Sequence, residues 1–201
     1  MSESSSRLVA LALLSSLVLT GCTSGDGTQP ASPGPAQRAT EDTAEPVPPA
    51  ASPAVKHVSV RVIDEDDLAE VLADYRGKVV LVDFWATWCL ACIELFPHTV
   101  ALHGQFAEEG LAVISVSFDQ PESRQVVLDF LKKHGATFDN FISRYGAGVE
   151  SAERFGLPGT LPQLLLFDRQ GELAHTFPEP QSGVNPEQVD QAVKELLGIA
   201  R

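Results

Sequence analysis

The chain has 201 residues and a formal net charge of −13 at pH 7, with 27 Asp and Glu against 14 Lys and Arg. Proteins that bind nucleic acid neutralise phosphates with clustered Lys and Arg, and this sequence contains no such cluster. Nucleic acid is therefore not an expected partner. The three cysteines include one close pair, which favours redox chemistry over a framework of structural disulfides.

Residues 1–22 have the pattern of an export leader. Arg7 precedes the apolar run Leu8–Leu19, which is shorter than the roughly 20 residues that span a bilayer. The run Leu19-Thr20-Gly21-Cys22 resembles a bacterial lipobox, in which the cysteine becomes the lipidated first residue of the mature protein. The alternative is an ordinary secretory leader in which Cys22 occurs by chance. We expect a protein of the cell envelope, anchored through lipid on Cys22 and facing the periplasm or another extracytoplasmic space.

The next segment, residues 23–54, is rich in Pro, Ala, Ser, Thr and Gly and has almost no large apolar side chains. Such a composition buries too little surface to offset the entropy lost on ordering. We expect a disordered tether that gives the following domain reach from a membrane. Residues 55–201 form that single domain, which is long enough for one hydrophobic core.

The domain alternates strand-like and helix-like segments, which predicts an α/β fold with a central mixed β-sheet and helices on both faces. In chain order, we expect a strand near 58–62, a helix after Asp64, a strand at 78–84, a helix at 89–109, a strand at 111–118, a helix at 123–134, an edge strand or loop at 138–142, a helix at 149–155, a hairpin of 164–167 with 173–177, and a helix at 186–197. Val58, Val60 and Val62 alternate with polar residues, which is typical of a strand. In the helix at 123–134, the residues expected to face inward are Val126, Val127, Phe130 and Leu131.

A pair of cysteines, Cys89 and Cys92, follows the apolar strand 78–84 and opens a helix. Two thiols at this spacing can close a disulfide within one helical turn. A helix N-terminus stabilises a thiolate and lowers the pKa of a thiol placed there. The alternatives are a structural disulfide and half of a zinc site. Zinc takes four ligands, and the sequence has neither a second cysteine pair nor histidines at ligand spacing beside this one. A redox dithiol is therefore the favoured interpretation.

The segment from Val82 to Cys92 resembles the active site of the thioredoxin superfamily, and residues 56–197 resemble its TlpA/ResA-like branch of membrane-tethered thiol–disulfide proteins. The resemblance implies a thioredoxin-like fold with an N-terminal βα extension and a central insertion, Gln120 to Phe155. It also implies protein thiol or disulfide substrates and an electron donor in the membrane. No cofactor is expected beyond the redox disulfide, no metal is expected, and a monomer is the default.

The two sulfurs are expected to have different tasks. Cys89, at the first turn of the helix, is the expected nucleophile, and the more buried Cys92 is expected to resolve the mixed disulfide. Asp83 interrupts an apolar strand, so its burial should raise its pKa. The resemblance implies that this carboxyl, six residues before the first cysteine, relays a proton to and from Cys92. The alternative is an Asp that bonds only to backbone or water.

A second loop completes the expected site. Thr160, Leu161 and Pro162 precede a strand and resemble the cis-proline loop of the family, which lies against the dithiol. This loop and Trp88 would contact an extended substrate segment. The alternative is a trans proline that opens an edge strand.

Three functions remain open from the sequence. Peroxidase chemistry is a weaker fourth, because Thr87 lies only two residues before Cys89 and the sequence lacks a peroxidase-type Thr-x-x-Cys arrangement. The first is a reductase of protein disulfides, favoured because the Leu90-Ala91 pair between the cysteines adds no charge that would strongly stabilise the Cys89 thiolate. The second is a disulfide-forming oxidase or isomerase, which the fold alone does not separate from a reductase. The third is a tethered binding module that uses the same scaffold without the chemistry.

Overall fold

The computed structural model describes residues 57–158, 160–178 and 183–199. The proposed leader 1–22 with Cys22 and the proposed tether 23–54 lie outside these residues. The strands are β1 (Arg61–Ile63), β2 (Val79–Trp85), β3 (Leu111–Ser117), β4 (Asp139–Ser143), β5 (Gln163–Phe167) and β6 (Leu173–Phe177). The helices are α1 (Glu65–Asp74), α2 (Leu90–Phe106), α3 (Arg124–His134), α4 (Val149–Arg154) and α5 (Pro186–Leu197), with a 3-10 turn η1 (Pro121–Ser123) before α3.

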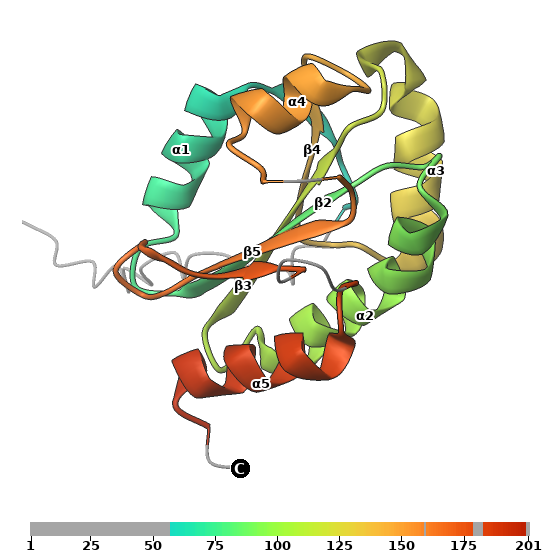
Figure 1. The fold of residues 1–201 in the computed structure, drawn as a ribbon. Coiled ribbons are helices and arrows are strands. Elements are labelled where there is room, and N and C mark those ends of the chain that lie inside the picture. Colours follow the sequence, from blue (N-terminus) through green and yellow to red (C-terminus); the bar gives the residue numbers. More distant parts are fainter. Residues whose placement is uncertain (1–56, 159, 179–182, 200–201) are drawn as a thin grey trace, which may run out of the picture. The chain divides into compact units, whose positions relative to one another are not determined.

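The six strands form one mixed sheet in the order β1-β4-β3-β2-β5-β6. The first four in this order are parallel to one another, whereas β5 runs antiparallel to β2 and β6 antiparallel to β5. Helices α1 and α4 lie on one face of the sheet, and α2, α3 and α5 lie on the other (Figure 1). The α/β architecture with helices on both faces and an N-terminal βα unit is confirmed. Within the described residues, no helix is both long and apolar enough to cross a bilayer.

Strand β2 occupies the centre of the sheet, and all seven of its residues are buried. Burial on both faces explains its nearly continuous apolar sequence. Side chains alternate along a strand, so Val80 and Val82 point to the α1 face, whereas Val79 and Leu81 point to the face covered by α2 and α5. The same alternation places Asp83 on the α2 face.

Helix α2 packs against this face through a stripe of buried side chains three or four positions apart. The stripe consists of Cys92, Leu95, Phe96, Thr99, Leu102 and Phe106. Pro97 lies inside the helix on its exposed side and has no backbone N–H to donate. The helix ends at Phe106, three residues before the predicted end, and a turn to Gly110 leads into β3.

Two predictions about side-chain orientation are corrected. Val62 is 41% exposed, whereas Val60 and Ile63 are buried, so the alternation predicted for the first strand is wrong. Val126 is 58% exposed although its neighbour Val127 is fully buried. A helix turns by about 100° per residue, so only part of the apolar run in α3 can face the core.

The segment predicted as an edge strand or loop is an interior strand. β4 lies between β1 and β3 and is parallel to both, and Phe141 and Ile142 are buried. The short N-terminal strand β1 forms this edge of the sheet instead. This order follows from the crossover through α3, which is long enough to return the chain parallel to β3.

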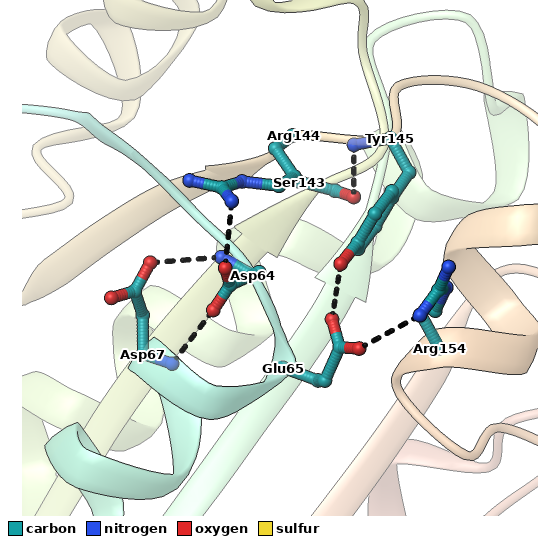
Figure 2. A network of polar contacts seen from close by, with 7 residues as sticks. All are labelled: Asp64, Glu65, Asp67, Ser143, Arg144, Tyr145 and Arg154. Atoms are coloured by element: carbon teal, nitrogen blue, oxygen red, sulfur yellow. Dashed lines mark hydrogen bonds and ion pairs between the residues drawn. The ribbon is translucent and has the colours of Figure 1, made fainter.

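A polar network joins the start of α1 to the end of β4 and to α4 (Figure 2). Arg144 forms an ion pair with Asp64 at 2.9 Å, while the Tyr145 hydroxyl donates to Glu65. Arg154 reaches the other oxygen of Glu65 at 3.4 Å. The N-terminal βα unit is thereby attached to the segment inserted between β3 and β5.

Matched variants in α3 test which side of this helix faces the core. We expect Val127→Ala to lower the free energy of unfolding by about 2 kcal/mol, because it removes two buried methyl groups and leaves a cavity. We expect Val126→Ala to change it by less than about 0.5 kcal/mol, because that side chain is exposed. Urea unfolding of the two variants measures both values, and equal losses would contradict the assigned orientation of α3.

Candidate redox site

The two cysteines lie where β2 ends and α2 begins. Cys89 is the N-cap of α2, and its sulfur accepts a hydrogen bond from the Cys92 backbone N–H at 3.2 Å. The two sulfurs form a disulfide. Cys89 is half-buried, whereas Cys92 is only 1% exposed. Cys89 is therefore the more accessible of the two cysteines, whereas Cys92 is enclosed.

A buried carboxylate holds the loop that carries Cys89. Asp119 follows β3 and is 3% exposed, and its oxygens accept hydrogen bonds from the Thr87 N–H at 2.9 Å and the Thr87 hydroxyl at 2.5 Å. The Ser117 hydroxyl donates to the same carboxylate at 2.6 Å. Both hydrogen-bond donors of Thr87, two residues before Cys89, are thus bonded to the residue that follows the neighbouring strand β3. This contact fixes the loop between β2 and α2.

Asp83 lies beneath α2, on the sheet face that the strand alternation assigns to it. Its carboxyl is 2% exposed and accepts a hydrogen bond from the Thr99 hydroxyl at 2.7 Å. Burial raises the pKa of Asp83 to about 7, and the hydrogen bond from Thr99 partly opposes that effect. The carboxyl can therefore gain or lose a proton near neutral pH, as the sequence suggested.

Pro162 precedes β5, and the Leu161–Pro162 peptide bond is cis. A cavity of about 370 Å³ has walls from Ala91, Glu94 and His98 of α2, from Pro162, and from Val184 before α5. Ala91 stands between the two cysteines in the chain. The cavity therefore joins Pro162 to Ala91, the residue that directly precedes Cys92.

The remaining residues predicted for the site divide between surface and interior. Trp88 is 59% exposed next to Cys89, whereas Trp85 is fully buried and packs against the ring of Phe96. Leu161 is half-buried and packs against the core cluster that contains Cys92. Thr160 is exposed, and its carbonyl accepts a hydrogen bond from the Gln163 side chain.

Two residues of this region were not found from the sequence. Asp119 could have been found, since the carboxyl ends of adjacent parallel strands meet at one edge of a sheet and Asp119 follows the strand paired with β2. Thr99 lies seven positions after Cys92 and hence on the same helix face, but a single threonine in a helix carries no signal of its own. Within the described ranges, no group of His, Cys, Asp and Glu is arranged to hold a metal ion.

The pH dependence of stability tests the environment of Asp83. Its pKa rises from 3.8 to about 7 on folding, so between these values the folded protein holds a proton that the unfolded chain has lost. The free energy of unfolding should therefore fall as the pH rises through this window. We expect Asp83→Asn, which has no charge to bury, to be more stable than the wild type at pH 8 by on the order of a few kcal/mol.

That difference should shrink steadily towards pH 4, where the wild-type carboxyl is neutral in the folded state. Urea unfolding of both proteins across this range measures it. A stability difference that does not change with pH would contradict the assigned protonation behaviour.

Comparison with known proteins yields one family and several relatives. Residues 55–176 match the AhpC/TSA family. The thiol-disulfide oxidoreductase ResA of Halalkalibacterium halodurans is 29% identical over 126 residues, which cover 63% of this chain and 66% of the relative. ResA of Geobacillus kaustophilus is 31% identical over 102 residues, which cover 51% of this chain and 55% of the relative. The matched part thus spans between about half and two thirds of these relatives.

Solved structures show the same fold. A protein from Chlorobium tepidum assigned as the thiol:disulfide interchange protein DsbE is 25% identical, with a TM-score of 0.53 over 63% of this chain and 85% of its own. A thioredoxin-like superfamily protein, SPOA0173, is 26% identical, with a TM-score of 0.52 over 64% of this chain and 86% of its own. Because the family match spans more than half of the sequence, the chain belongs to the AhpC/TSA family, and its domain has the thioredoxin-like fold.

Proposed function

We propose that this protein is a thiol–disulfide oxidoreductase that exchanges electrons with protein substrates through Cys89 and Cys92. The observation that carries the proposal is the unequal burial of the two bonded sulfurs, one reachable at a helix N-terminus and one enclosed. The relatives named as thiol-disulfide oxidoreductases support the same activity. We further propose that the physiological direction is reduction of the substrate.

In this direction the Cys89 thiolate attacks one sulfur of a substrate disulfide. A bond forms between Cys89 and that sulfur, the substrate S–S bond breaks, and the other substrate sulfur leaves as a thiolate. Cys92 then loses its proton and attacks the Cys89 sulfur, which closes the protein disulfide and releases the second substrate thiolate. Two electrons pass to the substrate. The dithiol itself is oxidised and must be reduced again by a separate donor.

Asp83 is proposed to take the proton that Cys92 loses. A group whose pKa lies near the working pH is suited both to accept and to return a proton. Asp83 lies on the sheet face covered by α2, the helix that carries Cys92, and both side chains are shielded from bulk water. No exposed base is therefore needed for the resolving step.

The substrate contacts are proposed to come from the cis-proline loop and the exposed tryptophan. Pro162 lines a cavity together with Ala91, and Leu161 packs against the core cluster that contains Cys92. Trp88 is exposed next to Cys89. An extended segment of the substrate could pair with backbone groups of this loop while its sulfur meets Cys89.

The place of action is proposed from the sequence alone. The leader 1–22, lipidation of Cys22 and the tether 23–54 would hold the domain at a membrane of the cell envelope, on the extracytoplasmic side. A donor in that membrane would restore the dithiol. The reductive direction is favoured because no charged side chain separates the cysteines, and an oxidase or isomerase is the alternative.

Two serine variants test the exchange mechanism. With the full chain and insulin as the disulfide substrate, we expect Cys89→Ser to abolish reduction, because the attacking sulfur is gone. We expect Cys92→Ser to stop after the first step and to accumulate a mixed disulfide between Cys89 and insulin. Mass spectrometry under non-reducing conditions detects this adduct.

The exposed variant Val126→Ala, which leaves the site intact, should reduce insulin as the wild type does. Full insulin reduction by Cys89→Ser would contradict the mechanism. A wild type that reduces no insulin would favour the binding-module alternative.

A further inference from the structure

Thr99 and Asp83 form a buried polar pair beneath α2. Thr99 is 0% exposed and Asp83 is 2% exposed, and their side-chain oxygens lie 2.7 Å apart. A hydroxyl has one proton to donate, and a threonine inside a helix commonly gives it to a backbone carbonyl of the preceding turn. Here the proton is directed to the carboxyl of the neighbouring strand instead.

The pair is attached to the helix that carries the resolving thiol. Thr99 lies seven positions after Cys92 in α2, which is about two turns and ~10 Å along the axis on the same face. Helical side chains lean towards the N-terminus, so the Thr99 hydroxyl covers the turn that lies nearer to Cys92. The hydrogen bond therefore sets where the Asp83 carboxyl stands relative to α2.

The same hydrogen bond acts on the charge of Asp83. A donated O–H stabilises a carboxylate more than a neutral acid, whereas burial does the opposite. Among the described residues, burial and Thr99 are the two influences on the pKa of Asp83, and no charged side chain contributes. The strand neighbours opposite Asp83 are Ser115 of β3 and Leu164 of β5, neither of which is charged.

The two histidines of α2 that follow Pro97 contact other groups. His98, next to Thr99 in α2, lies 3.0 Å from Asp190 of α5. His103 lies against the ring of Phe138. Thr99 is thus the side chain of α2 that forms a hydrogen bond with Asp83.

We propose that Thr99 is a positioning residue of the exchange reaction, whose hydroxyl holds the Asp83 carboxylate in place and stabilises its negative charge, so that it can accept the proton of Cys92. This inference rests on the proposed function. It adds that the Thr99 hydroxyl allows Asp83 to act as a base near neutral pH. Without the hydroxyl, Asp83 stays protonated to higher pH and the resolving step loses its acceptor.

Two matched variants separate the hydroxyl from the volume of the side chain. Thr99→Val keeps the shape and removes the O–H, whereas Thr99→Ser keeps the O–H and removes a methyl group. Thr99→Ala serves as a second hydroxyl-free variant if the valine variant does not fold. All are made in the full chain and compared with the wild type.

The first readout is the titration of the Asp83 carboxyl carbon by NMR in the oxidised protein, which does not depend on activity. We expect Thr99→Val to move its midpoint upward by about one pH unit and Thr99→Ser to restore it, since a hydrogen bond to a charged group contributes on that scale. An unchanged midpoint in Thr99→Val would overturn the proposal.

The second readout uses the reduced protein and an aromatic disulfide, dithionitrobenzoate. The first thionitrobenzoate released reports attack by Cys89, and the second reports resolution by Cys92. We expect Thr99→Val to slow the second release about fivefold at pH 7 and to leave the first unchanged, because a one-unit shift reduces the charged fraction of Asp83 by about that factor.

Equal slowing of both releases, or a shifted titration without a slower second release, would overturn the proposal. A wild type that releases no second thionitrobenzoate would instead contradict the proposed function. In that case the NMR titration alone would still decide whether Thr99 controls the charge of Asp83.

Discussion

The packing of α2 against the central strand β2 is the constraint on which the rest of the site depends. Because only the four residues 86–89 separate the strand from the helix, the N-cap residue lies at the carboxyl end of β2, while the first buried turn of the helix lies over the sheet face. Cys89 therefore stays within reach of solvent, and Cys92, one turn on, is enclosed. The two sulfurs differ in accessibility although they are bonded to each other and three residues apart.

Two further contacts hold the residues around the cysteine pair in place. Asp119 at the end of β3 ties down the backbone and side chain of Thr87, so the loop before Cys89 is fixed from the neighbouring strand. On the other side, Pro162 precedes the antiparallel strand β5, which pairs with β2 and brings its loop to the same edge. The site is thus assembled at the ends of three adjacent strands. β2 leads to the cysteine pair, β3 to the carboxylate of Asp119, and the cis-proline loop leads into β5.

Sequence reasoning was sufficient where a single residue pattern determines the local structure. The apolar run of β2, the cysteine pair at the start of α2 and the proline before β5 each carry such a pattern, and the raised pKa of Asp83 follows from its place in an apolar strand. The orientation of Val126 and the interior position of β4 were missed, because both depend on which elements pack together in space. Thr99 was missed for the same reason, since its partner is 16 residues away on another element.

The central claim is that Cys89 and Cys92 form a couple that donates electrons to protein disulfides. The most direct test is the reduction potential of this couple, measured on the full chain in dithiothreitol or glutathione buffers of defined composition. We expect a potential of about −270 mV, in the range of thioredoxin, which identifies a reductant that must be resupplied with electrons. A potential between about −120 and −180 mV, the range of disulfide donors and isomerases, would contradict the reductive direction.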